Sequence, residues 1–153
     1  PWDLRKVGHV FRRAGFGATW KQLQAGLKDG PKKLVDKLLV EQTDFEGFDK
    51  ETDDFLATSA KKFNTGEQAS GWWLYRMMTS NFPLREKISL FWHNHFATSN
   101  SKVQNVPAMV GQYELIRTHA LGNFADLLQG MSKDPAMMIW LDTIESKKGQ
   151  PNE

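Results

Sequence analysis

The sequence predicts an all-α protein, an irregular multi-helix globular bundle of about seven helices with one acidic loop. Apolar residues recur at helical spacing in most segments, and residues that cap helices stand at the segment ends. No stretch shows sustained alternation of apolar and polar residues between hairpin signals, so a sheet is not expected. The chain has 153 residues, 40% of them hydrophobic. This is the length of one domain and enough apolar material for a single core.

The first 40 residues predict three helices. Asp3 is placed to cap the first helix. Thr19 followed by Gln22 is a capping-box pattern at the start of a second, short helix. The run Asp29-Gly30-Pro31 ends that helix, and a third is expected over residues 31–40 because proline is tolerated at a first helical position.

Residues 41–54 break the helical pattern. Their carboxylates greatly outnumber their single cation, Lys50. The acidic residues are Glu41, Asp44, Glu46, Asp49, Glu51, Asp53 and Asp54. Such a stretch predicts an acidic surface loop.

The remaining chain predicts helices only. Thr65 and Gln68 repeat the capping-box pattern ahead of a strongly apolar helix. Pro83 opens the next helix, which the polar run at residues 99–101 is expected to end. Further helices are predicted at residues 107–120, 124–131 and 135–141.

Composition limits the function classes. Twenty Lys and Arg against eighteen Asp and Glu give a net charge of +2, which disfavours nucleic-acid binding. The alternative, binding through Arg5, Lys6, Arg12 and Arg13, would show steep salt dependence. The longest apolar run, residues 136–141, is far shorter than the roughly 20 residues of a membrane span. The absence of cysteine excludes disulfides and a cysteine nucleophile within the chain.

The strongest candidate for chemistry is His93-Asn94-His95, because imidazoles bind metal ions and transfer protons near neutral pH. Residues two apart on a helix lie about 200° apart around its axis, so the two rings cannot hold one ion unless the helix breaks there. A metal-assisted hydrolase would need groups from other segments. Glu153 is then the catalytic candidate beside His93 and His95, and Asn94 and Asn152 are binding candidates.

The histidines also have a structural interpretation. In this alternative, His95 is a hydrogen-bonded core residue on the apolar face of its helix, and His93 is partly exposed near the face of Glu86. No contiguous ligand motif such as His-Glu-x-x-His occurs in the sequence, so the metal and any cofactor stay unknown.

Two further groups of residues have both a functional and a structural interpretation. Arg12 and Arg13 beside the glycines at 15 and 17 resemble an anion-binding corner, but a glycine C-cap with solvated arginines explains the same residues. Four tryptophans could form a carbohydrate platform, although their positions on apolar helices favour core packing. They are Trp72, Trp73, Trp92 and Trp140.

Distinctive strings follow one another along the chain: Arg12-Arg13-Ala14-Gly15-Phe16-Gly17, Trp73-Leu74-Tyr75-Arg76-Met77, Pro83-Leu84-Arg85-Glu86-Lys87 and Phe91-Trp92-His93-Asn94-His95-Phe96. In this order they resemble the N-terminal portion of the bacterial domain-of-unknown-function family 1800. The similarity continues through residues 119–124, 134–137 and 149–153, and so covers nearly the whole chain.

The resemblance implies a bacterial protein that is exported or periplasmic and has a sulfatase-like partner protein. Family members continue beyond the pair Asn152 and Glu153, so residues 1–153 are expected to form a single helical domain that is the N-terminal part of a larger one. No reaction or cofactor comes with the family. The leading hypothesis is therefore a helical segment that makes packing, partner or glycan contacts. The alternative is a metal-assisted hydrolase whose centre is completed by downstream residues.

Overall fold

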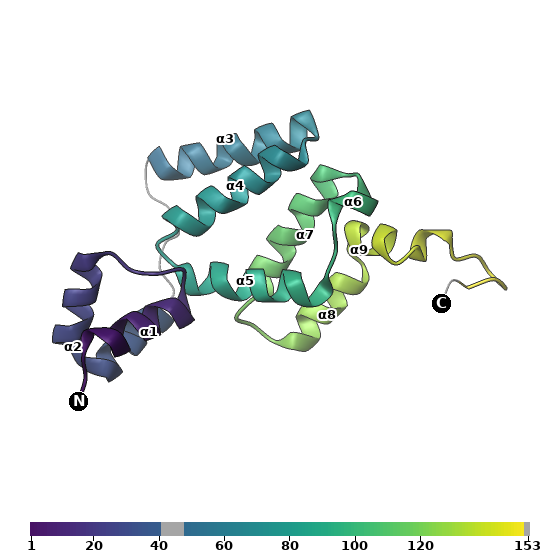
Figure 1. Cartoon of the computed structure of the whole chain (residues 1–153). Helices are drawn as coiled ribbons and strands as arrows, with labels where there is room; N and C mark the ends of the chain where they lie inside the picture. The colour runs from purple at the N-terminus through teal and green to yellow at the C-terminus, as the bar shows by residue number, and fades with distance from the viewer. Residues whose placement is uncertain (41–47, 152–153) are drawn as a thin grey trace.

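The computed structural model describes residues 1–40 and 48–151. As predicted, this part of the chain is all-α, with nine α-helices, seven of them of seven residues or more, and no strand (Figure 1). In chain order, the helices are α1 (Leu4–Ala14), α2 (Trp20–Leu39), α3 (Phe48–Phe63), α4 (Gly66–Thr79), α5 (Pro83–Phe96), α6 (Asn100–Val103), α7 (Val106–His119), α8 (Phe124–Ser132), α9 (Pro135–Trp140) and the short 3₁₀ helix η1 (Thr143–Glu145). None of these helices combines the length and the apolar character that crossing a bilayer requires.

Helices α1 and α2 pack against each other at one end of the molecule (Figure 1). The predicted caps are confirmed: Asp3 accepts a hydrogen bond from the Lys6 amide, and the Thr19 capping box forms in both directions. The predicted break appears as a kink at Gly30, whose φ of 80° lies in the left-handed region that glycine tolerates. The two helices approach closely because Gly26 has no side chain; a Cβ there would stand 2.8 Å from Val7 Cγ1.

The acidic stretch is not a loop over residues 48–54, which form the first turns of α3. Residues 41–47 of the predicted loop lie outside the described residues. Asp53 is only 3% exposed and pairs with Arg76 of α4. Among the described side chains of α3, the buried face includes the carboxylate of Asp53 as well as Ala60. A pattern based on apolar spacing misses this helix because a charged residue lies on its buried face.

Helix α7 is the centre of the fold and carries residues of two buried clusters. Trp72 of α4 packs with Val106, Val110 and Tyr113 of α7 in the first cluster. The second joins α7 to α8 and α9 through Ile116, Leu127, Met131 and Met137, with Trp92 and Trp140 packed against it. Core packing is therefore the role of Trp72, Trp92 and Trp140, as the structural interpretation predicted.

The segment between α5 and α7 differs from the prediction. Helix α5 ends at Ala97 in the left-handed conformation, with φ 55°. Ser99 then caps the one-turn helix α6, where the sequence predicted only the end of the preceding helix. The second predicted capping box does not form, because the Thr65 side chain makes no cap hydrogen bond. This backbone path brings residues 98–101 opposite α4.

Candidate functional site

A cleft of about 310 Å³ lies between α4, α5, α6 and α7. Its volume is at the lower end of the range of about 300–1,000 Å³ that small-molecule sites occupy. Aromatic rings form its inner walls, and hydroxyl and amide groups surround them. The aromatic residues are Trp72, Trp73 and Tyr113, and the polar residues include Ser70, Thr98, Ser99, Asn100 and Ser101.

Consecutive tryptophans of α4 serve different purposes because neighbouring residues on a helix are turned by about 100°. Trp72 is 1% exposed and donates its indole N–H to Asp53 Oδ1 at 2.8 Å. Trp73 contacts two cleft residues: its ring centroid lies 4.8 Å from that of His93 and 4.7 Å from that of Tyr113. The Trp73 ring is thus held between α5 and α7.

Two polar atoms of the cleft residues are buried without a hydrogen-bond partner among the described residues. They are Trp73 Nε1 and Thr98 Oγ1. Thr98 is only 3% exposed, because the left-handed turn at Ala97 carries it inward. Folded proteins satisfy most buried polar atoms, and an unpaired one costs about 1–3 kcal/mol. Both residues line the cleft, so its lining includes two buried polar atoms that no described residue satisfies.

The cleft is electrically neutral. None of the described residues that line it is Asp, Glu, Lys or Arg. The imidazole in the lining, His93, is half-buried, and this burial lowers its pKa below the ordinary value of 6.5 by disfavouring the charged ring. His93 therefore stays uncharged at neutral pH. Such a site does not suit phosphate or carboxylate ligands.

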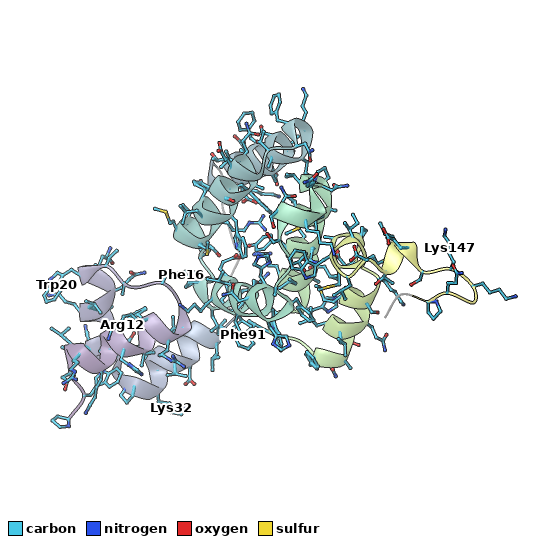
Figure 2. All side chains as sticks on the ribbon, turned by 45° about the vertical axis from the view of Figure 1, so that its right-hand side comes forward. Arg12, Phe16, Trp20, Lys32, Phe91 and Lys147 are labelled. Atoms are coloured by element: carbon cyan, nitrogen blue, oxygen red, sulfur yellow. The ribbon has the colours of Figure 1, made fainter. Side chains whose placement is uncertain are left out.

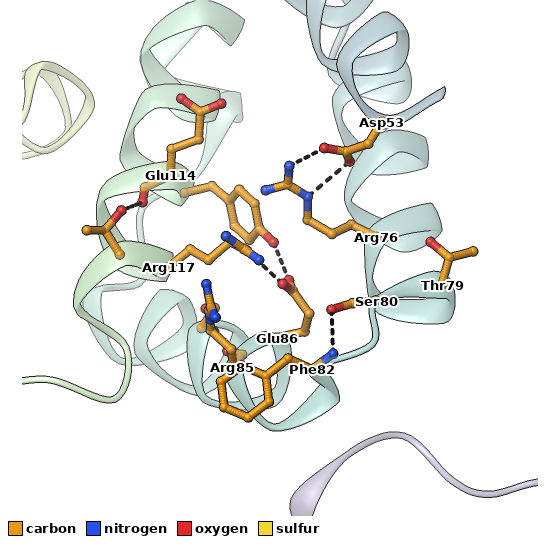
Figure 3. A network of polar contacts seen from close by, with 12 residues as sticks. Asp53, Arg76, Thr79, Ser80, Phe82, Arg85, Glu86, Glu114 and Arg117 are labelled. Carbon is orange, nitrogen blue, oxygen red and sulfur yellow. Dashed lines mark hydrogen bonds and ion pairs between the residues drawn. The ribbon is translucent and has the colours of Figure 1, made fainter. Parts of the chain in front are cut away.

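Behind the aromatic wall lies a network of buried charges (Figure 3). Glu86 of α5 is fully buried and accepts hydrogen bonds from Arg117 Nε, at 2.7 Å, and from the Tyr113 hydroxyl. On the opposite side of the network, Arg76 pairs with Asp53 and lies over the Tyr113 ring, 5.7 Å from its centroid. Buried charges are tolerated only when they are paired and hydrogen-bonded. This network fixes Tyr113 in the cleft wall.

The same surroundings control the protonation of Tyr113. Burial is the main reason why its pKa lies well above the ordinary value, and the nearby Glu86 carboxylate raises the pKa further. The hydroxyl stays protonated and remains a donor to Glu86. Tyr113 therefore presents a neutral aromatic face to the cleft.

The structure places one of the two histidines as the structural interpretation expected, since His93 is partly exposed on the face of Glu86. The alternative that placed His95 in the core is wrong, because His95 is exposed and lies beside Phe91, which is 55% exposed (Figure 2). His93 is the residue turned inward, on the face that also buries Glu86 and Ser89. Helix α5 buries this polar face because Glu86 finds its partners there. The two rings do not converge on one site.

The other predicted site residues are not brought to the cleft. Arg12, Arg13 and Asn94 are exposed and do not line it. Asn152 and Glu153 lie outside the described residues, so the predicted grouping with the histidines is untested. Within residues 1–40 and 48–151, no three His, Cys, Asp or Glu side chains are close enough together to hold a metal ion.

Sequence reasoning missed Thr98 and Tyr113. Nothing in the local pattern marks Thr98, since its burial depends on the left-handed residue before it. Tyr113 occupies an ordinary apolar position of α7, and only its contact with Glu86, 27 positions away, distinguishes it. Trp73 had a signal, its pairing with Trp72, which suggested a carbohydrate platform.

The fold and the cleft define an all-α domain with an uncharged, aromatic-walled candidate ligand site. A family model described as "Protein of unknown function (DUF1800)" matches residues 9–153. The chain belongs to this family, as the resemblance predicted. No curated protein and no solved structure matches it.

Proposed function

We propose that this domain binds a neutral carbohydrate in the cleft between α4 and α7. The observation that carries the proposal is the pair of unpartnered polar atoms, Trp73 Nε1 and Thr98 Oγ1, beside aromatic faces. A sugar offers what this wall lacks: hydroxyl oxygens that accept from the indole and exchange hydrogen bonds with the threonine. Its apolar C–H face would pack on the ring of Trp73.

The charge of the cleft supports a neutral sugar over other polar ligands. A phosphate or carboxylate would lose its hydration without meeting Lys or Arg, at a cost of several kcal/mol. Hydroxyl groups, in contrast, are matched by the neutral donors and acceptors of Thr98 and Asn100. An exported or periplasmic location, which the family resemblance implies, would give the cleft access to polysaccharides outside the cytoplasm.

The test is calorimetric titration of the full chain with neutral hexasaccharides: cellohexaose, maltohexaose, xylohexaose, mannohexaose, laminarihexaose and chitohexaose. At least one is expected to bind saturably. Thr98→Val keeps the shape of the side chain and removes its hydroxyl, whereas Trp73→Phe removes the indole N–H together with one ring. Each should weaken binding by about tenfold or more. Trp20→Phe is the matched control, because Trp20 is 62% exposed on α2 and does not line the cleft.

Binding by none of the six sugars, or equal binding by Thr98→Val and wild type, would overturn the proposal. The same samples also test the hydrolase alternative, for which His93 is the predicted catalytic residue that lines the cleft among those the structure describes. Chromatography of the sugar after incubation distinguishes a sugar-binding domain from a hydrolase. A bound sugar recovered intact supports a binding domain, whereas shortened products that disappear in His93→Gln would make the domain an enzyme.

A further inference from the structure

Helix α1 carries a line of basic side chains on its exposed side. Arg5, His9 and Arg12 are spaced by four and three residues, which places them on one face of the helix. All three are exposed. Together with Trp2 and Lys6, they line a concave region of about 510 Å³. Figure 2 shows Arg12 on the pair formed by α1 and α2, at the end of the molecule away from α6 to α9.

Arg5 and Arg12 differ from the lysines of α2 in forming no ion pair with the described residues. On α2, Lys33 pairs with Asp29 at 2.9 Å, and Lys32 pairs with Asp36. Within the described part of the chain, no carboxylate forms an ion pair with Arg5 or Arg12.

One carboxylate, that of Asp3, does line the concave region. It caps α1 by accepting from the Lys6 amide at 2.9 Å. The guanidinium groups of Arg5 and Arg12 are thus available to an external anion.

The distribution of charge along the chain strengthens this difference. Residues 1–40 contain nine Lys and Arg against three Asp, a net charge of +6, whereas the whole chain carries only +2. The positive and negative charges of the whole chain nearly balance, but its first 40 residues carry a clear net positive charge. A local charge of this size attracts polyanions through its own field.

We propose that the exposed face of α1 binds an anionic polysaccharide that lies along the helix. Arg5 and Arg12 are seven residues apart, about 10 Å along the axis, so they contact successive acidic groups of an extended chain. Guanidinium groups bind oxyanions through two parallel hydrogen bonds, and His9 stands between the two arginines as a further donor.

Two features favour a polysaccharide over other polyanions. Single-stranded nucleic acids are held by stacking on several aromatic side chains. Here one ring, Trp2, lines the region, and its indole N–H is donated to Gly26 O at 3.2 Å. A membrane surface requires an apolar helix face that can insert, but Val7 of α1 is fully buried, and Leu4 is the one large apolar residue of this helix that is exposed, at 37%.

The experiment measures binding of the full chain to heparin, to polygalacturonate, to a thymidine oligonucleotide and to vesicles of phosphatidylglycerol and phosphatidylcholine. Each probe is titrated between about 50 and 200 mM salt, where charge-dominated binding falls steeply. Heparin and polygalacturonate separate sulfate from carboxylate recognition. We expect at least one of the two polysaccharides to bind more tightly than the oligonucleotide and the vesicles.

The variant Arg5→Gln/Arg12→Gln should weaken polysaccharide binding by about tenfold or more, because two charged hydrogen-bonding groups are lost. Lys32→Gln/Lys33→Gln removes the same charge from α2 and should change binding less than about threefold. Equal losses in both variants, or tighter binding of the oligonucleotide or the vesicles, would overturn the proposal. The arginine variant should still bind the neutral sugar of the cleft, so the two proposals fail separately.

Discussion

The Trp73 indole meets the His93 ring edge to face, with the ring centroids 4.8 Å apart and the ring planes at 89°. This contact joins α4 to α5 at the cleft. Burial of His93 lowers its pKa, so the imidazole in this contact is favoured in its uncharged form. The cleft and the stability of the domain are therefore linked through the protonation of one residue.

The first prediction concerns pH. The pKa of His93 is lower in the folded chain than in the unfolded chain, so the unfolded chain takes up a proton first as the pH falls. This contribution to stability is complete above the unfolded pKa of 6.5 and is lost as the pH drops through the folded pKa. Urea unfolding of wild type between about pH 7.5 and 5 should show the free energy of unfolding falling with pH. The same series with His93→Gln should show a smaller dependence on pH.

His95→Gln is the matched control for this pH series, because it removes an exposed imidazole from the same helix. Its unfolding free energy should follow the wild-type pH dependence. A slope that disappears in His95→Gln but persists in His93→Gln would contradict the assignment of the buried ring.

The second prediction separates binding from stability at Thr98. Its hydroxyl has no partner among the described residues, so Thr98→Val removes a buried polar group without breaking a hydrogen bond. The free energy of unfolding should stay equal or rise by about 1–2 kcal/mol. Ser89→Ala is a useful contrast, because the Ser89 hydroxyl donates to Arg85 O at 2.8 Å. A large loss of stability in Thr98→Val would mean that the hydroxyl has a structural partner.

The third prediction concerns the buried charges. Arg117→Met leaves the fully buried Glu86 without its ion-pair partner, and should cost about 3–5 kcal/mol of unfolding free energy. Lys61→Met breaks the exposed pair with Glu114 and should cost at most about 1 kcal/mol. Denaturant unfolding of both variants measures the difference. Similar losses of unfolding free energy in the two variants would contradict the burial of Glu86 beside Arg117.

The fourth prediction tests the close approach of α1 and α2. A Cβ at Gly26 would stand 2.8 Å from Val7 Cγ1, and overpacking of this kind costs about 1–3 kcal/mol. Gly26→Ala should therefore destabilise the domain despite the better helix propensity of alanine. Gly71→Ala in α4 meets no atom within 4 Å and should instead stabilise it by about 0.5–1 kcal/mol. Stabilisation of the protein by both substitutions would contradict the close contact between Gly26 and Val7.

Features fixed by neighbouring residues could be predicted from the sequence. The capping box at Thr19 and the break at Gly30 depend on residues within one or two turns, and both are found. The burial of Asp53, and of the α5 face that carries Glu86 and His93, could not be predicted. It depends on partners from other helices, because Arg76 pairs with Asp53 and Arg117 with Glu86.

The same limit applies to the candidate site. The tryptophan pair and the histidine cluster indicated where aromatic and titratable groups gather. Both tryptophans, Trp72 and Trp73, line the cleft, but of the two histidines only His93 does. Which histidine faces the cleft follows from the packing of α5 on α7. The position of Thr98 depends on the turn at Ala97, where a non-glycine residue takes a left-handed conformation that sequence patterns do not predict.

The most direct test of the cleft as a sugar site is the NMR spectrum of the indole N–H groups during titration with the neutral hexasaccharides. The chain has six tryptophans, and Trp73→Phe identifies the Trp73 resonance. Trp2 and Trp92 are internal references, because they already donate to the carbonyls of Gly26 and Ala120. A sugar-dependent shift of the Trp73 resonance, with both references unchanged, is the predicted result. A Trp73 resonance that stays in place with every sugar would contradict the account.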